Sequence, residues 1–103
     1  MARPAVHPGE FLADELAELA ITPTELARQI AVPANRITQI IQGKRSISGD
    51  TALRLGHWFG TSPQFWLNLQ AIFDLRIAEQ AVGAIIKSLP TKATLPGNPI
   101  GPG

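Results

Sequence analysis

The chain has 103 residues, a formal net charge of +1 at pH 7 and 45% hydrophobic residues, which predicts a single domain with one core. It has no cysteine, so disulfides and thiolate metal sites are excluded. No signal-peptide pattern and no apolar run long enough to span a bilayer occur, so we expect a soluble cytoplasmic protein without membrane contact.

The charges are distributed unevenly along the chain. The first quarter is acidic, with Glu10, Asp14, Glu15, Glu18 and Glu25. Between Leu26 and Gly49 the only charges are basic: Arg28, Arg36, Lys44 and Arg45. Positive potential confined to one segment is typical of nucleic-acid contact, and the alternative is a scatter of charge over a small surface.

The first helix is predicted to begin at His7 or Pro8, after a flexible arm over 1–6, because a proline at the first helical position loses no hydrogen bond. Its buried face repeats at i, i+4 and i+7, as Leu12, Leu16 and Leu19. Nearly opposite lie Glu10, Asp14 and Glu18. These carboxylates form either a solvated face or a contact with a basic partner.

Two short helices joined by a tight turn are predicted between Thr22 and Gly43. Thr22 and Glu25 have capping-box spacing, which begins the first helix. Pro33 lacks an N–H and fits only at the start of the second helix. Gly43 is placed to end that helix in the left-handed conformation. This pattern predicts a helix-turn-helix.

The second of these helices has one apolar and one uncharged polar face. Ile37, Ile40 and Ile41 fall at i, i+3 and i+4 and predict the buried side. The other side, which we name the amide face, consists of Asn35, Thr38, Gln39 and Gln42. Amide side chains form paired hydrogen bonds with adenine in the major groove, so we predict that this face contacts the bases of double-stranded DNA. The alternative is an uncharged solvent-exposed face.

Residues flanking the amide face are predicted to contact DNA phosphates, through side chains or a helix N-terminus. They are Thr22, Thr24, Arg28, Arg36, Lys44 and Arg45. Arg54 lies past the loop that follows, so we expect it to form a structural ion pair or an exposed charge.

Two more helices are predicted, one from the cap Ser48 to Gly60 and a longer one after Ser62. The longer helix is apolar over a wider arc than one core requires, so we expect a second copy of the chain to cover part of it. Phe59 and Phe65 are assigned to the core. The predicted dimer interface is Trp66, Leu69, Phe73 and Ile77. The two-fold symmetry of such a dimer predicts a palindromic operator.

No strand pattern occurs, so the predicted fold is all-α, with five helices in a domain over 7–89. Over 90–103 the composition changes to Pro, Gly, Thr and Asn. We expect this tail to be disordered or attached to a partner.

Several motifs together resemble the HigA-type (VapI-like) antitoxins of the Xre/Cro helix-turn-helix class. They are His7–Glu10, Leu26–Ala27, Asn35–Ile37, Gly43–Ser48, Asp50–Leu55 and Phe65–Gln70. The resemblance implies a lambda-repressor-like domain that dimerises through an extended C-terminal helix, represses its own operon and neutralises a HigB toxin, a RelE-like ribonuclease that cuts mRNA. One departure is Ala31, in a turn where related repressors often have glycine, so that a left-handed conformation there would be strained.

Two other functions remain open: a stand-alone Xre-family regulator without a toxin, and a protein-binding module that no longer contacts DNA. A toxin would contact either the acidic residues Glu10, Asp14 and Glu18 or the proline-rich tail. We do not expect an enzyme, a cofactor or a small-molecule substrate. His7 and His57 are far apart in sequence and neither has metal-ligand spacing.

Overall fold

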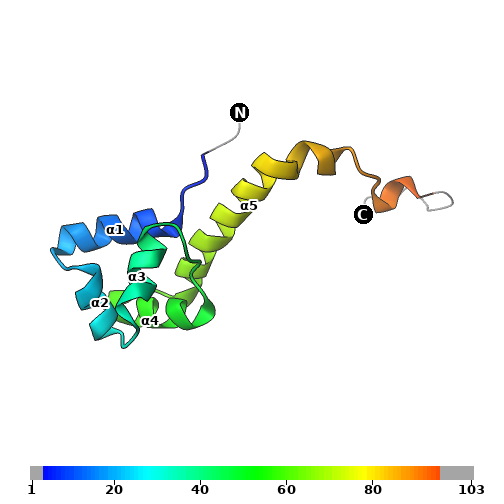
Figure 1. Cartoon of the computed structure of the whole chain (residues 1–103). Helices are drawn as coiled ribbons and strands as arrows, with labels where there is room; N and C mark the ends of the chain where they lie inside the picture. Colours follow the sequence, from blue (N-terminus) through cyan, green and yellow to red (C-terminus); the bar gives the residue numbers. More distant parts are fainter. Residues whose placement is uncertain (1–3, 96–103) are drawn as a thin grey trace.

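The computed structural model describes residues 4–95. Its elements are α1 (Pro8–Leu19), α2 (Pro23–Gln29), α3 (Ala34–Ile41), α4 (Gly49–Phe59), α5 (Pro63–Lys87) and a short 3₁₀ helix, η1 (Lys92–Thr94). The five-helix, all-α prediction is confirmed, since no strand occurs within these residues. Helices α1 to α4 form a body with the start of α5, and the rest of α5 extends away from it (Figure 1).

The predicted helix boundaries follow from local capping. The hydroxyl oxygens of Thr22, Ser48 and Ser62 accept backbone N–H groups at 3.1, 3.4 and 3.1 Å and begin α2, α4 and α5. Gly43 and Gly60, both with φ of 75°, follow α3 and α4 as predicted.

The predicted capping box at α2 is only half formed. The Thr22 hydroxyl accepts the Glu25 N–H, but the Glu25 carboxylate accepts from the side chains of Arg28 and Gln29. A charged donor one turn away competes successfully with the backbone N–H of Thr22, because charge-assisted hydrogen bonds are the stronger ones.

The core lies where α1, α2, α3, α4 and the start of α5 meet. Its fully enclosed large side chains are Leu12, Leu26, Ile37, Ile40, Leu55 and Trp66. Leu16 is buried with them, but the prediction that Leu19 belongs to this face is wrong, since Leu19 is 55% exposed. It lies in the last turn of α1 and points into an open groove.

A glycine lets α1 and α3 approach each other closely. A Cβ atom at Gly9 would lie 1.9 Å from the carbonyl oxygen of Ile40, so any side chain there would push α3 away. His7 caps the same end of α1, where its Nδ1 accepts the Gly9 N–H at 2.9 Å. The His7 ring also packs edge-on against Phe73 of α5, with centroids 4.8 Å apart. This corner fixes α3 relative to both α1 and α5.

The two halves of α5 differ in burial. Trp66 and Gln70 are buried in the first half, and the Gln70 side-chain oxygen accepts the Ile47 N–H at 2.8 Å, which ties the loop after α3 to α5. The second half exposes Val82, Ile85 and Ile86. No helix within residues 4–95 has the length and apolar character needed to cross a membrane.

Candidate nucleic-acid interface

Helix α3 presents the amide face outward. Ile37 and Ile40 are fully buried and Ile41 packs partly against the core, so the predicted inward face is confirmed. Asn35 and Gln42 are exposed on the other side of the helix. Thr38 and Gln39 share that side and are half-buried. The sequence therefore places uncharged hydrogen-bonding groups on the free surface of α3.

The amides of this face are unoccupied by internal contacts. Within residues 4–95, no hydrogen bond uses the side chains of Asn35, Gln39 or Gln42. The Thr38 hydroxyl donates back to the Asn35 carbonyl oxygen at 3.2 Å. In that state Thr38 offers an acceptor oxygen and a methyl group to a ligand, whereas each amide offers both donors and acceptors.

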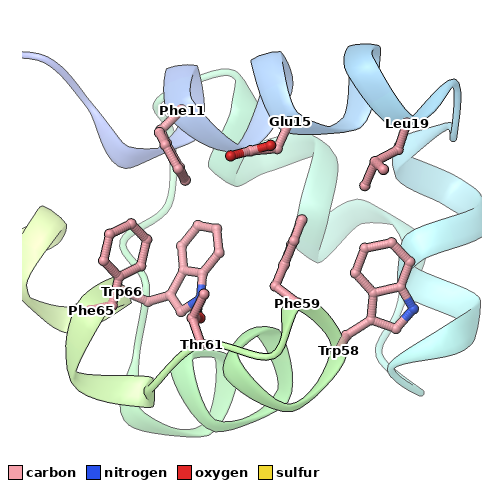
Figure 2. A pocket seen from close by; sticks show the side chains of 8 residues that line it. All are labelled: Phe11, Glu15, Leu19, Trp58, Phe59, Thr61, Phe65 and Trp66. Carbon is pink, nitrogen blue, oxygen red and sulfur yellow. The ribbon is translucent and has the colours of Figure 1, made fainter.

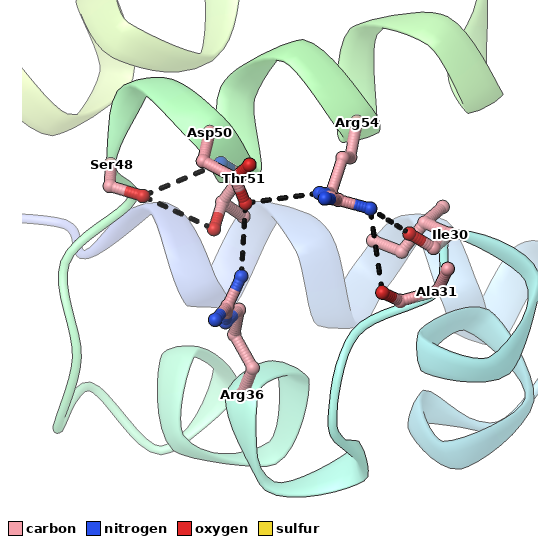
Figure 3. Close-up of polar contacts among 7 residues, drawn as sticks. All are labelled: Ile30, Ala31, Arg36, Ser48, Asp50, Thr51 and Arg54. Carbon is pink, nitrogen blue, oxygen red and sulfur yellow. Dashed lines mark hydrogen bonds and ion pairs between the residues drawn. The ribbon is translucent and has the colours of Figure 1, made fainter.

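The turn between α2 and α3 is strained and held by a side chain from α4. Ala31 has φ of 59°, the left-handed conformation that costs energy for a residue with a Cβ atom, as the sequence indicated. Arg54 Nη1 donates to the carbonyl oxygen of Ile30 at 2.8 Å and to that of Ala31 at 3.4 Å (Figure 3). Arg54 thus satisfies carbonyl groups left free at the end of α2.

Asp50 links Arg54, which holds the turn, to Arg36 of α3. Its carboxylate accepts from Arg54 Nε and Arg36 Nη1, both at 3.0 Å (Figure 3). The hydrogen bond from Arg54, together with the positive charges of Arg54 and Arg36, holds the pKa of Asp50 below its ordinary value. The predicted structural ion pair of Arg54 is confirmed. Arg36, predicted to contact phosphate, is held by this carboxylate in the free protein.

The other predicted phosphate contacts lie around α3. Arg28 pairs with Glu25, and the hydrogen bonds from Arg28 and Gln29 hold the pKa of Glu25 below its ordinary value. Lys44 and Arg45 are exposed in the loop after α3, and no ion pair within residues 4–95 includes them. Thr22 and Thr24 are exposed at the start of α2. Their roles as phosphate contacts remain predictions.

A polar hollow of about 390 Å³ lies beside this loop, at the N-terminus of α4. It brings together Arg36, Arg45, Ser46, Ser48, Asp50 and Thr51. Ser46 was not among the predicted phosphate contacts. The guanidinium of Arg45 and the N-terminus of α4 suit an anion such as phosphate, whereas the Asp50 carboxylate in the same hollow is paired with Arg36. No cluster of metal-ligating side chains occurs within residues 4–95.

The predicted dimer interface needs correction. Trp66 is 0% exposed and belongs to the core, so it is not available to a second copy of the chain. Phe65, assigned to the core, is instead 36% exposed. Leu69 and Phe73 are partly buried against the body, and Ile77 is exposed. The exposed apolar residues lie farther along α5: Ile72, Leu75, Ile77, Val82, Ile85 and Ile86.

The acidic residues of α1 are exposed, as predicted. Glu10, Asp14 and Glu18 lie on its outer side. The ion pairs within residues 4–95 use Glu25 and Asp50 as their carboxylates, and none uses these three. Contact between this surface and a toxin remains a prediction.

Comparison with known proteins gives close relatives over most of the chain. No family model matches. Virulence-associated protein I of Dichelobacter nodosus is 45% identical over 78 residues, which cover 75% of this chain and 72% of that protein. A HigA-family addiction module antidote protein from Coxiella burnetii has a solved structure with a TM-score of 0.85 and 47% identity, covering 86% of this chain and 98% of that one.

A second solved structure shows a relative on DNA. It is the Pseudomonas aeruginosa antitoxin HigA with the higBA promoter, with a TM-score of 0.81 and 44% identity, covering 84% of this chain and 97% of that chain. The similarity to these two solved structures covers 84–86% of this chain.

Proposed function

This chain belongs to the HigA-type, VapI-like antitoxin family of helix-turn-helix proteins, and from that premise we propose that it represses its own operon and neutralises a toxin. The observation that carries the DNA-binding part is the amide face. Four short polar side chains project from a helix whose opposite side is locked into the core by Ile37 and Ile40. Support comes from the Pseudomonas relative, whose structure was solved with promoter DNA.

In the proposed complex, α3 enters the major groove. Asn35 and Gln39 form paired hydrogen bonds with base edges, and Thr38 supplies a methyl group and an acceptor. Gln42 lies at the end of α3 and contacts either a base or the backbone. The hollow at the start of α4, with Arg36 and Arg45, receives a phosphate, while Lys44, Arg28, Thr22 and Thr24 contact neighbouring phosphates.

The proposed repressor is a homodimer formed through the second half of α5. That half carries apolar side chains that the body leaves uncovered, including Leu75, which is 63% exposed. Leu75, Val82 and Ile86 fall at i, i+7 and i+11 on one face of α5, and an exposed apolar face of this kind is typical of a protein interface. A two-fold pair places the two α3 helices about one DNA turn (~34 Å) apart and requires a palindromic operator.

The proposed antitoxin partner is a RelE-like, mRNA-cleaving HigB toxin. Support comes from family membership and from the unpaired carboxylates Glu10, Asp14 and Glu18, which would attract a basic protein. Reversing these three residues to lysine should slow association with the toxin at low salt. An unchanged association rate would show that this surface has no part in binding.

The DNA-binding proposal is tested by titrating the wild-type protein and single variants against the chain's own promoter. Asn35→Ala and Gln39→Ala should each weaken operator binding by about 1–3 kcal/mol, because each removes a paired base contact. Binding to unrelated DNA should change little. Gln64→Ala, which removes an exposed amide from α5, is the matched control and should bind normally. Unchanged operator binding in both α3 variants would refute the proposed contact face.

A further inference from the structure

An aromatic groove runs between α1 and the junction of α4 with α5 (Figure 2). It encloses about 480 Å³. Its ring-bearing walls are formed by Phe11, Trp58, Phe59, Phe65 and Trp66. Helix α3 contributes no residue to this groove, so it is separate from the amide face.

The rings form one continuous cluster, in which Trp66 is fully buried and the other rings are at least partly exposed. Ring centroids are 5.5 Å apart between Phe11 and Phe65, 5.6 Å between Phe11 and Trp66, and 5.2 Å between Phe59 and Trp66. The indole N–H of Trp66 donates to the Thr61 hydroxyl at 2.9 Å, and that of Trp58 donates to the Gln29 side-chain oxygen at 2.7 Å. Since both indole donors are satisfied and Trp66 is fully buried, the groove offers an incoming group the exposed parts of Phe11, Trp58, Phe59 and Phe65.

One carboxylate, that of Glu15, lines the groove and shares a face of α1 with Phe11 and Leu19 (Figure 2). At 3.6 residues per turn, this face lies between the core face of α1 and the acidic face that carries Glu10, Asp14 and Glu18. Helix α1 contains no lysine or arginine. A group entering the groove therefore meets apolar rings and uncompensated negative charge together.

We propose that this groove binds a segment of the toxin that presents an arginine flanked by apolar side chains. The guanidinium would stack on the exposed rings and pair with Glu15, while the flanking side chains would cover Phe65 and Leu19. Binding energy at protein interfaces concentrates in aromatic and arginine anchors of this kind. The inference rests on the proposed antitoxin function and specifies the surface that serves it.

The shape of the groove favours a protein over a small molecule. Sites for small molecules bury most of the ligand surface. Here Leu19 and Phe65 remain exposed at the rim, so a larger surface is needed to cover them. Because α3 contributes no residue to the groove, a toxin segment bound in it need not contact the amide face.

The test measures binding of the purified antitoxin to the protein encoded by the adjacent gene, in a catalytically inactive form. Phe65→Ala and Glu15→Lys should each raise the dissociation constant about tenfold or more. The effect of Glu15→Lys should shrink at high salt, whereas that of Phe65→Ala should persist. Leu53→Ala, an exposed apolar residue outside the groove, is the matched control and should bind normally.

Operator binding and the thermal unfolding midpoint are measured for every variant, to show that the fold is retained. If Phe65→Ala unfolds, Leu19→Arg at the exposed rim replaces it and should weaken toxin binding to the same extent. Unchanged toxin binding by folded groove variants would overturn the groove assignment and leave the antitoxin function standing. Failure of the wild-type protein to bind the toxin would overturn both. A groove variant that changes only self-association would assign the groove to a second copy and overturn the proposal.

Discussion

Helices α3 and α5 both have a surface that the core leaves free, but the chemistry of the two surfaces is opposite. On α3 the free side carries amides and a hydroxyl. On the second half of α5 it carries isoleucine, leucine and valine. Amides suit the hydrated edges of base pairs, whereas apolar side chains gain free energy only when another protein surface excludes water from them. The difference indicates which partner each helix is suited to bind.

The largest expected effect is the difference in stability loss between a substitution in the first half of α5 and one in its second half. Trp66→Ala should lower the free energy of unfolding by about 3–5 kcal/mol, because it leaves a cavity in a fully packed site. Leu75→Ala should change the stability of the monomer by about 0.5 kcal/mol or less, since its side chain is exposed there. Urea unfolding at a protein concentration where the chain is monomeric measures both. Equal losses would show that α5 is packed uniformly along its length.

The next largest effect is on dimerisation, and it tests the second half of α5 as the dimer interface. The double variant Leu75→Asp with Ile86→Asp should raise the dimer dissociation constant about hundredfold, because it places charges where water would be excluded. The monomer should remain folded, since both side chains are exposed in it. Sedimentation equilibrium measures the association. A double variant that dimerises like the wild type would place the interface elsewhere.

A smaller effect concerns how α3 is held for DNA contact. Arg54→Met should destabilise the protein by about 1 kcal/mol and weaken operator binding, because the carbonyl groups of Ile30 and Ala31 lose their donor. Arg54→Lys should recover only part of this, since an ammonium group does not reproduce the two-sided contact with Asp50 and the turn. Operator titration and urea unfolding measure both properties. Wild-type stability and operator affinity in Arg54→Met would show that the conformation of the turn does not depend on Arg54.

The smallest expected effect is at His7, which caps the start of α1 and packs against Phe73 of α5. Burial lowers the pKa of His7, although Asp74 and Glu10 act in the opposite direction. The unfolded chain therefore binds a proton at a higher pH than the folded one. This contribution to stability is complete above the ordinary histidine pKa and is lost as the pH falls from that value through the lower pKa of the folded state.

His7→Asn preserves a side-chain acceptor for the Gly9 N–H but does not titrate in this range. Unfolding measured from about pH 8 to about pH 5 should show a smaller fall in stability for the variant than for the wild type. Identical pH profiles would show that His7 does not contribute to the pH dependence. His57→Asn, at an exposed position of α4, is the matched control.

Local signals in the sequence were sufficient to predict much of this fold. The starts of α2, α4 and α5 depend on one hydroxyl and its neighbouring N–H groups, and Gly43 and Gly60 end two helices through their own φ angles. The buried side of α3 followed from the spacing of three isoleucines, because the rest of that helix is polar.

Long-range features were not predictable in the same way. Trp66 was expected at the dimer interface but is buried, and Phe65 was expected in the core but is partly exposed. A helix that is apolar on several sides does not reveal which side faces the core. The contact of Arg36 with Asp50 spans fourteen positions in sequence and depends on how α3 and α4 pack. The aromatic groove likewise gathers residues from α1, α4 and α5, so no local pattern predicts it.

The most direct test of the account asks whether one amide of α3 contacts one base pair. Operator binding is measured for the wild type and Gln39→Ala against the natural operator and against symmetric substitutions at each half-site position. The account predicts that Gln39→Ala removes about 1–3 kcal/mol of discrimination at one position of each half-site and leaves the others unchanged. A uniform loss at every position, or full discrimination in the variant, would contradict it.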